Sequence, residues 1–116
     1  MSARSVTATL INKTNQSLTL IGSKLVHGTW SENQTPPSEI PAGGQGNWMA
    51  ESNGFATGVE GTVTYLAGNV GQAACYFDNP YVGSNSYSGS APNGFVITVV
   101  GSGGDNSTVT YTLTNA

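Results

Sequence analysis

Few residues in this 116-residue chain could perform acid–base or metal chemistry, and they are scattered along it. There is one histidine, His27, one cysteine, Cys75, and six carboxylates without paired spacing. A zinc site needs about three or four His, Cys or carboxylate ligands. Much of the chain separates His27 from Cys75. We therefore expect no metal site, no cofactor and no catalytic residue.

His27 could be catalytic or structural, and it is the histidine that any Ser-His-Asp set would have to use. It follows Leu25 and Val26 and precedes Gly28, which favours a histidine at a strand end that bonds to backbone over a positioned catalytic base. Two of the six carboxylates could still meet in the fold as a glycosidase pair, and sequence spacing leaves this open. The sequence favours binding over catalysis.

The best candidates for binding are aromatic residues in segment 78–88. This segment follows the apolar run 73–77, and Pro80 and a glycine are expected to end the preceding strand. Tyr81 and Tyr87 are then predicted on a loop among small polar residues, and loops often carry function. Such rings could stack on a sugar, or enclose a quaternary ammonium through cation–π attraction worth ~0.5–2 kcal/mol per ring.

The two tryptophans can be assigned either to binding or to the core. Trp30 lies beside Gly28 and ahead of a Pro-Pro loop, so it is a candidate neighbour of the tyrosines. Trp48 lies in apolar strand sequence, which favours the core. The alternative for all these rings is structural, because Trp and Tyr are highly buried on average and could cap the end of a sandwich.

Composition restricts the partners. Only 8% of the residues are charged, the net charge is −3, and the basic residues are Arg4, Lys13 and Lys24. Three basic residues cannot neutralise a run of phosphates, so we expect no nucleic-acid partner. Attraction to anionic lipid, about 1 kcal/mol per basic residue, is weak for the same reason. A membrane contact would therefore rest on aromatic residues and neutral head groups.

Two features bear on the cellular compartment. Cys75 lies within an apolar run, so we expect a small buried hydrophobe and no disulfide within the chain. Residues 1–5 lead directly into strand-like sequence, with no signal-peptide core and no apolar span of membrane length. We expect a soluble protein or a mature form, and its localisation stays open.

The elements that position these residues are predicted to be strands. Apolar residues alternate with threonines at 6–10 and 109–113, and the same period of two appears at 18–20. Further strands are predicted near 25–26, 46–51, 62–66, 72–77 and 95–100, with Gly, Pro and Asn turns between them. We predict one domain, residues 1–116, folded as an all-β antiparallel sandwich without a long helix. The residues predicted to be mostly buried are Val6, Leu10, Leu18, Leu20, Val63, Phe77, Ile97, Val109 and Leu113.

Three segments carry a family resemblance: H-G-T-W at 27–30, G-V-E-G-T-V-T-Y-L at 58–66, and F-D-N-P-Y at 77–81. The chain resembles the actinoporin-like cytolysins, in which a strand of the pattern T-G-x-x-G-x-x-x-Y is followed by an apolar strand that closes on a Pro-Tyr and by a loop rich in tyrosine and tryptophan. The loop here departs from that pattern, because it reads V-G-S-N-S at 82–86. The x-G-x-W and aromatic-Asp-x-Pro-aromatic segments are similar to those of the aegerolysins.

The resemblance implies a compact actinoporin/aegerolysin-type β-sandwich whose end loops recognise lipid head groups, phosphocholine or another sphingolipid group. Carried over by position, the head-group pocket involves Pro80, Tyr81, Asn85, Ser86 and Tyr87, with Gly58 and Val59 at the entrance to the neighbouring strand. Actinoporins begin with an amphipathic helix that enters the bilayer, whereas strand sequence here starts within a few residues of Met1. An aegerolysin-like role suits this better: lipid binding, with a partner protein for any perforation.

A glycan is the alternative ligand, because related sandwiches include fungal fruit-body lectins. A membrane-binding surface needs a contiguous apolar rim around the aromatic residues. A sugar pocket instead needs convergent polar groups such as Asp78, Asn79 and Asn85. The sequence leaves lipid and sugar open, and the oligomeric state as well.

Overall fold

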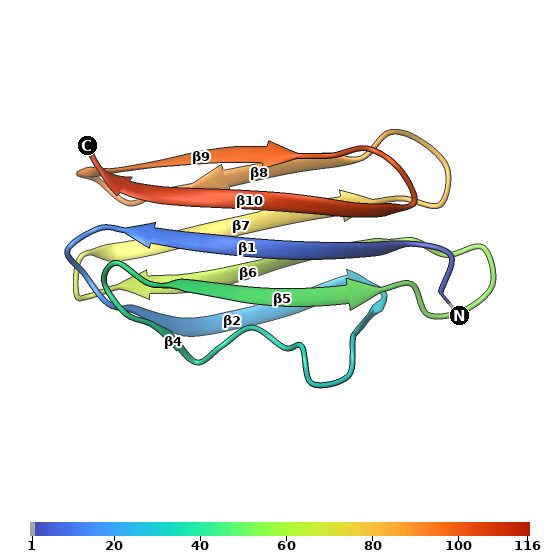
Figure 1. The fold of residues 1–116 in the computed structure, drawn as a ribbon, viewed down its shortest axis with the longest axis horizontal. Coiled ribbons are helices and arrows are strands. Elements are labelled where there is room, and N and C mark those ends of the chain that lie inside the picture. The colour runs from blue at the N-terminus through green and yellow to red at the C-terminus, as the bar shows by residue number, and fades with distance from the viewer. Residues whose placement is uncertain (1) are drawn as a thin grey trace.

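A computed structural model describes residues 2–116, which form two five-stranded sheets packed face to face (Figure 1). The first sheet has the order β3-β5-β1-β10-β9 and the second β4-β2-β6-β7-β8. The strands are β1 (Ser5–Lys13), β2 (Leu18–His27), β3 (Thr29–Trp30), β4 (Glu39–Ile40), β5 (Gln45–Glu51), β6 (Val59–Ala67), β7 (Gly71–Asn79), β8 (Ser86–Ser90), β9 (Phe95–Gly101) and β10 (Asn106–Asn115).

The predicted all-β sandwich is confirmed, and every predicted strand lies within an observed one. Leu18–Leu20 and Leu25–Val26 belong to one long strand, β2, which bulges between them instead of turning. The antiparallel prediction was wrong for one pair, because β1 and β10 run parallel in the centre of their sheet. The alternation of side chains reports which face is buried but not the direction of a neighbour. Residues 2–116 contain no helix of the length and apolarity that a membrane crossing requires.

The core lies between the sheets, where the inward residues of β1, β6, β7 and β10 interdigitate. Of the nine residues predicted to be mostly buried, all except Leu20 and Ile97 are buried; these two pack against the core from its margin. Trp48 is a core residue, as expected, and stacks on Tyr111 with 6.2 Å between ring centroids. Cys75 is buried, and burial raises the pKa of its thiol to about 12. A thiol in that state is inert.

The sandwich has two different ends, at the right and left of Figure 1. The loop end carries the N-terminal residues, the β5–β6 loop (52–58), the β7–β8 loop (80–85) and the β9–β10 loop (102–105). The turn end carries the connections β1–β2, β4–β5, β6–β7 and β8–β9. The predicted binding segment therefore lies at the loop end.

Candidate functional site

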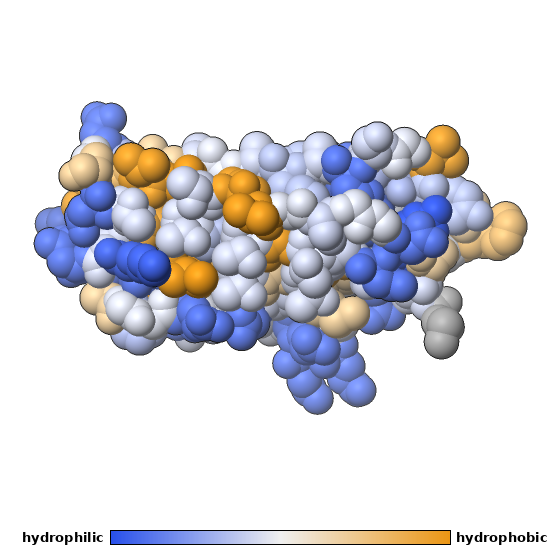
Figure 2. Space-filling view, turned by 45° about the horizontal axis from the view of Figure 1, so that its top comes forward, coloured by the Kyte–Doolittle hydropathy of each residue, from blue (hydrophilic) through white to orange (hydrophobic). Residues whose placement is uncertain are grey.

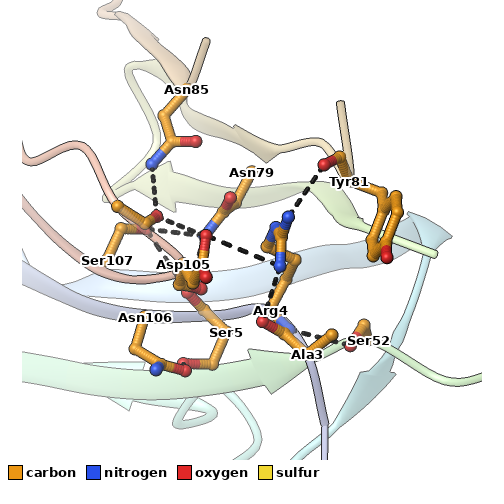
Figure 3. Close-up of polar contacts among 11 residues, drawn as sticks. Ala3, Arg4, Ser5, Ser52, Asn79, Tyr81, Asn85, Asp105, Asn106 and Ser107 are labelled. Carbon is orange, nitrogen blue, oxygen red and sulfur yellow. Dashed lines mark hydrogen bonds and ion pairs between the residues drawn. The ribbon is translucent and has the colours of Figure 1, made fainter. Parts of the chain in front are cut away.

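The loop end is organised around Asn79, a buried residue at the end of β7. Its side-chain Nδ2 donates to the carbonyl oxygens of Ser5, Gly104 and Asp105, at 2.9–3.2 Å, and lies 3.3 Å from Ser107 Oγ (Figure 3). One amide thus ties the second sheet to β1 and to the β9–β10 loop of the first. Asn79 therefore links the two sheets, and its Nδ2 is not available to a ligand.

Arg4 forms the second link among these loops (Figure 3). Its Nη2 donates to the carbonyl oxygen of Tyr81 at 2.8 Å, and its Nη1 lies 3.5 Å from Asp105 Oδ1. Its guanidinium carbon is 4.7 Å from the centre of the Tyr81 ring, within the range of a cation–π contact. One face of Tyr81 is therefore already occupied, and any cationic ligand would have to use the other face.

The larger cavity at the loop end has a volume of about 550 Å³ and lies beside Arg4. It brings together five of the predicted site residues: Pro80, Tyr81, Asn85, Ser86 and Tyr87. The glycine- and serine-rich β9–β10 loop forms its other wall. A volume of this size matches a small-molecule or head-group site.

The structure corrects the position of Tyr87, which lies in β8 and not on a loop. Its ring fills the space above Gly101, where a Cβ would lie 2.2 Å from a ring carbon, and its hydroxyl donates to Ser102 O at 2.7 Å. Asn85 Nδ2 also bonds across this gap, to Ser102 O and Gly104 O. Both side chains thus hold β8 to the β9–β10 loop, and Tyr81 is the freer ring, 40% exposed.

A second cavity of about 350 Å³ lies on the other side of Pro80 and Tyr81, which line both cavities. It contains three more predicted residues, Gly58, Val59 and Asp78. A Cβ on Gly58 would lie 2.7 Å from the carbonyl oxygen of Asn79, so only glycine lets the β5–β6 and β7–β8 loops approach this closely. The side chain of Val59 is buried in the core.

Titratable residues form a row across the second cavity. His27, Glu60 and Asp78 are direct neighbours on β2, β6 and β7, so their side chains share the outer face of the sheet. The expected backbone bond of His27 is not the contact found; its Nε2 lies 3.9 Å from Glu60 Oε1. Two of the carboxylates that showed no paired spacing in the sequence therefore meet across strands.

The electrostatics of this row differ from those of the Arg4 cavity. Desolvation raises the pKa of Asp78 above its ordinary value of 3.8, the Glu60 carboxylate raises it further, and His27 opposes this. Tyr76 donates a 2.6 Å hydrogen bond to Glu60 Oε2. Like charges directly opposite on two strands are destabilising, and a cationic ligand would relieve that cost. Among residues 2–116, no three His, Cys, Asp or Glu side chains group as a metal site.

Trp30 lines neither cavity. It lies in β3, and its ring packs edge-on against Phe77 with 6.4 Å between ring centroids. The predicted residues thus divide between two adjoining cavities, with Trp30 beneath them as partly buried packing.

Sequence reasoning missed the two apolar side chains of the loop end that are the most exposed among residues 2–116. Phe55, in the β5–β6 loop, is 95% exposed, and Val82, in the β7–β8 loop, is 84% exposed. Figure 2 shows hydrophobic side chains projecting at this end of the molecule. Ala56, next to Phe55, has φ = 55°, a conformation that costs an alanine about 1 kcal/mol or more. Phe55 breaks the period of two inside a Gly- and Asn-containing turn, and that signal was available in the sequence.

Comparison with known proteins identifies the family: the aegerolysin family model matches residues 3–116. This chain belongs to the aegerolysin family. The lipid-binding protein Nakanori superimposes with a TM-score of 0.82 at 13% identity, covering 97% of this chain and 72% of Nakanori. RahU, solved with a TRIS molecule, gives 0.80 at 15% identity and covers 100% and 98%; IP-1A from Alcaligenes faecalis gives 0.78 at 18% and covers 98% and 92%. At these identities the likeness concerns the fold.

An uncharacterised protein of Dictyostelium discoideum is 32% identical over 87 residues, which is 74% of this chain. The chain spans only 8% of the length of that relative. The match therefore covers most of this chain and a small part of a much larger protein.

Proposed function

We propose that this aegerolysin binds the head groups of membrane lipids through its loop end. The observation that carries the proposal is the pair of exposed side chains, Phe55 and Val82, which lie on the two loops that flank the second cavity. Side chains of this kind, beside a head-group-sized cavity, suit insertion at the boundary between head groups and acyl chains. The named lipid binding of Nakanori, a protein of the same fold, supports this choice.

The polar groups favour lipid over sugar as the ligand. A sugar pocket needs convergent donors and acceptors. The Nδ2 of Asn79 is buried and donates within the protein, and the Nδ2 of Asn85 donates to two carbonyl oxygens of the β9–β10 loop. Of the three residues named for a sugar site, Asn79 and Asn85 thus use their side-chain donors within the protein, and Asp78 faces the second cavity.

The charges of the two cavities suggest a zwitterionic head group. Arg4 is the only lysine or arginine among the residues that line them, and its guanidinium suits a phosphate oxygen. Glu60 and Asp78, on the other side of Tyr81, suit an ammonium group. Phosphocholine and phosphoethanolamine both carry this pair of charges, and we propose that a lipid of this class bridges the ring of Tyr81.

Perforation is a separate step, and we propose that it requires a partner protein. In this chain β1, β6, β7 and β10 supply the buried core, so refolding them into a membrane would expose that core. We therefore expect binding without dye release when the protein is added alone to vesicles. Addition of the partner protein should then cause dye release.

Sedimentation with liposomes of defined head group, run beside a glycan array, tests the proposal. We expect binding to zwitterionic vesicles, a silent array and little dependence on salt, because one basic residue lines the site. Tyr81→Ala should bind about 5-fold more weakly, since one ring contributes ~1 kcal/mol. Tyr81→Phe is the matched control and should bind like the parent. Sugar binding without liposome binding would overturn the proposal in favour of a lectin.

A further inference from the structure

The two long sides of the sandwich are protected very differently. On one side β4 pairs with only Leu18 and Thr19 of β2, so most of β2 is an edge as well, but this edge has two register shifts and carries Lys24. Bulges and lysines are two ways in which proteins prevent other chains from pairing with an edge strand. On the opposite side the outermost strands are β8, with five residues, and β9, with seven. This second side offers a full-length edge.

The β9 edge also lacks the usual side-chain protection. From Asn79 to Gly104 the chain has no charged residue, and β9 itself, F-V-I-T-V-V-G, contains no proline. Val96, Thr98 and Val100 point outward and are exposed, Val100 to 74%. Charged or proline-containing edges discourage pairing, whereas a long, uncharged, β-branched edge invites it.

We propose that β9 is a self-association surface, on which a second copy of this chain adds its own β9 in antiparallel orientation about Thr98. The hydrogen-bonding groups on the open edge of β9 would then be paired, and the two five-stranded sheets would join into one. Strand addition to an exposed edge is a general recognition mode, with affinity from main-chain hydrogen bonds.

The sequence of β9 argues for a second copy over an unrelated strand. A two-fold interface must be self-complementary. Centred on Thr98, antiparallel pairing places Val96 opposite Val100, Ile97 opposite Val99, and Thr98 opposite itself. Val–Val and Thr–Thr pairs are favourable cross-strand neighbours. No charge on β8 or β9 opposes the approach, and β8 presents only small side chains at Ser88, Gly89 and Ser90.

The geometry has a functional consequence, which rests on the proposed lipid binding. β9 runs from the turn end to the loop end (Figure 1). Two antiparallel copies therefore point their loop ends in opposite directions. Such a dimer would connect two membrane surfaces instead of binding one surface twice. One strand edge buries far less than a standard interface of roughly 1,600 Å², so we expect a dissociation constant on the order of 10–100 µM.

Cysteine cross-linking tests the register. In an antiparallel pair, opposite Cα atoms lie about 4.5–5.5 Å apart, within disulfide range. Thr98→Cys should therefore form a covalent dimer under mild oxidation. Val96→Cys should not, because the two Val96 positions would be roughly 13 Å apart. Native Cys75 is buried and gives no background. Equal cross-linking of both variants, or none with Thr98→Cys, would overturn the proposal.

Sedimentation velocity between about 1 and 200 µM tests the unmodified edge. The parent should dimerise, and Thr98→Lys should weaken dimerisation at least 10-fold, because it places two ammonium groups face to face on the two-fold axis. Thr7→Lys, on the exposed face of β1 in the same sheet, is the matched control and should dimerise normally. A parent that is monomeric throughout, or a dimer insensitive to Thr98→Lys, would contradict the inference.

Aggregation of phosphocholine vesicles, followed by turbidity, tests the consequence. Thr98→Lys should still sediment with single vesicles but no longer aggregate them. If the parent binds no vesicles, lipid binding fails while the cross-linking result still decides self-association. If Thr98→Lys aggregates vesicles as well as the parent, dimerisation through β9 is not what connects the membranes.

Discussion

Each end of the sandwich contains a buried asparagine whose side chain bonds to loop carbonyl oxygens, and the two ends differ in the residues around that asparagine. At the turn end, buried Asn12 donates from Nδ2 to the carbonyl oxygens of Gln16, Ile40 and Pro41, and accepts at Oδ1 from Thr14. At the loop end, buried Asn79 donates from Nδ2 to the carbonyl oxygens of Ser5, Gly104 and Asp105. Each asparagine satisfies loop carbonyls that would otherwise be left unpaired inside the protein.

The difference lies outside these asparagines. The loop end leaves two adjoining cavities and exposes Phe55 and Val82 beyond them, whereas the turn end exposes Val70 at about half its surface. The buried asparagine is therefore common to both ends, whereas the proposed binding surface belongs to the loop end. A buried asparagine that ties loops together preorganises them, and preorganisation lowers the entropic cost of binding.

Replacing each asparagine in turn distinguishes the effect on stability, which both ends share, from the effect on binding, which we expect only at the loop end. Asn79→Ala and Asn12→Ala should each destabilise the fold by about 3 kcal/mol, a fall of roughly 15 °C in Tm, because buried carbonyls lose their donor. Differential scanning calorimetry measures this. At a temperature where both variants are folded, liposome affinity should fall only for Asn79→Ala. Equal losses of affinity would show that the turn end also contributes to binding.

The exposed apolar side chains give the next largest effect. The double variant Phe55→Ser, Val82→Ser should bind zwitterionic vesicles about 30-fold more weakly, because each side chain loses about 1 kcal/mol of burial at the interface. Val70→Ser, at the turn end, is the control and should bind like the parent. Circular dichroism should be unchanged in both, since none of these residues is buried. Unchanged vesicle binding in the double variant would remove the principal support for membrane insertion.

Part of the fold could be predicted from the sequence. The alternation in β1, β6, β7 and β10 identified the core faces, because burial of one face repeats every second residue. It could not reveal the parallel β1–β10 pair, which depends on the path of the chain between sheets. β8, S-Y-S-G-S, is not among the predicted strands, because small polar residues carry no alternation signal.

The candidate site was predictable only in part. Pro80 and Tyr81 stood out by residue type, and both line the cavities. The Glu60–Asp78 pair did not, because strand register brings together residues far apart in the chain. Nor did the sequence indicate that Arg4 would occupy one face of Tyr81, a contact across most of the chain. The local sequence pattern therefore located the loop of Pro80 and Tyr81. The charged groups beside that loop could be found only from the contacts between distant parts of the chain.

The carboxylate row at the loop end gives the smallest and most specific effect. Because the native pKa of Asp78 is raised above its ordinary 3.8, the unfolded chain releases this proton more readily than the native protein. Stability therefore falls as pH rises from that ordinary value through the raised native pKa, and the loss persists at neutral pH. Asp78→Asn should raise Tm by about 1–3 °C at pH 7, and the gain should vanish below about pH 4.

Glu39→Gln, at the turn end, is the matched control, since Glu39 has no carboxylate opposite it: its strand partner is Thr19. Its Tm difference from the parent should be small at every pH. If Asp78→Asn gave the same gain at pH 3 as at pH 7, the cost would be steric and not electrostatic. A zwitterionic ligand should reduce the gain at pH 7, because its ammonium group relieves the repulsion in the parent but has one carboxylate fewer to contact in the variant. That ligand dependence would locate the cation-binding half of the site on Glu60 and Asp78, at the end of the molecule that already carries Phe55 and Val82.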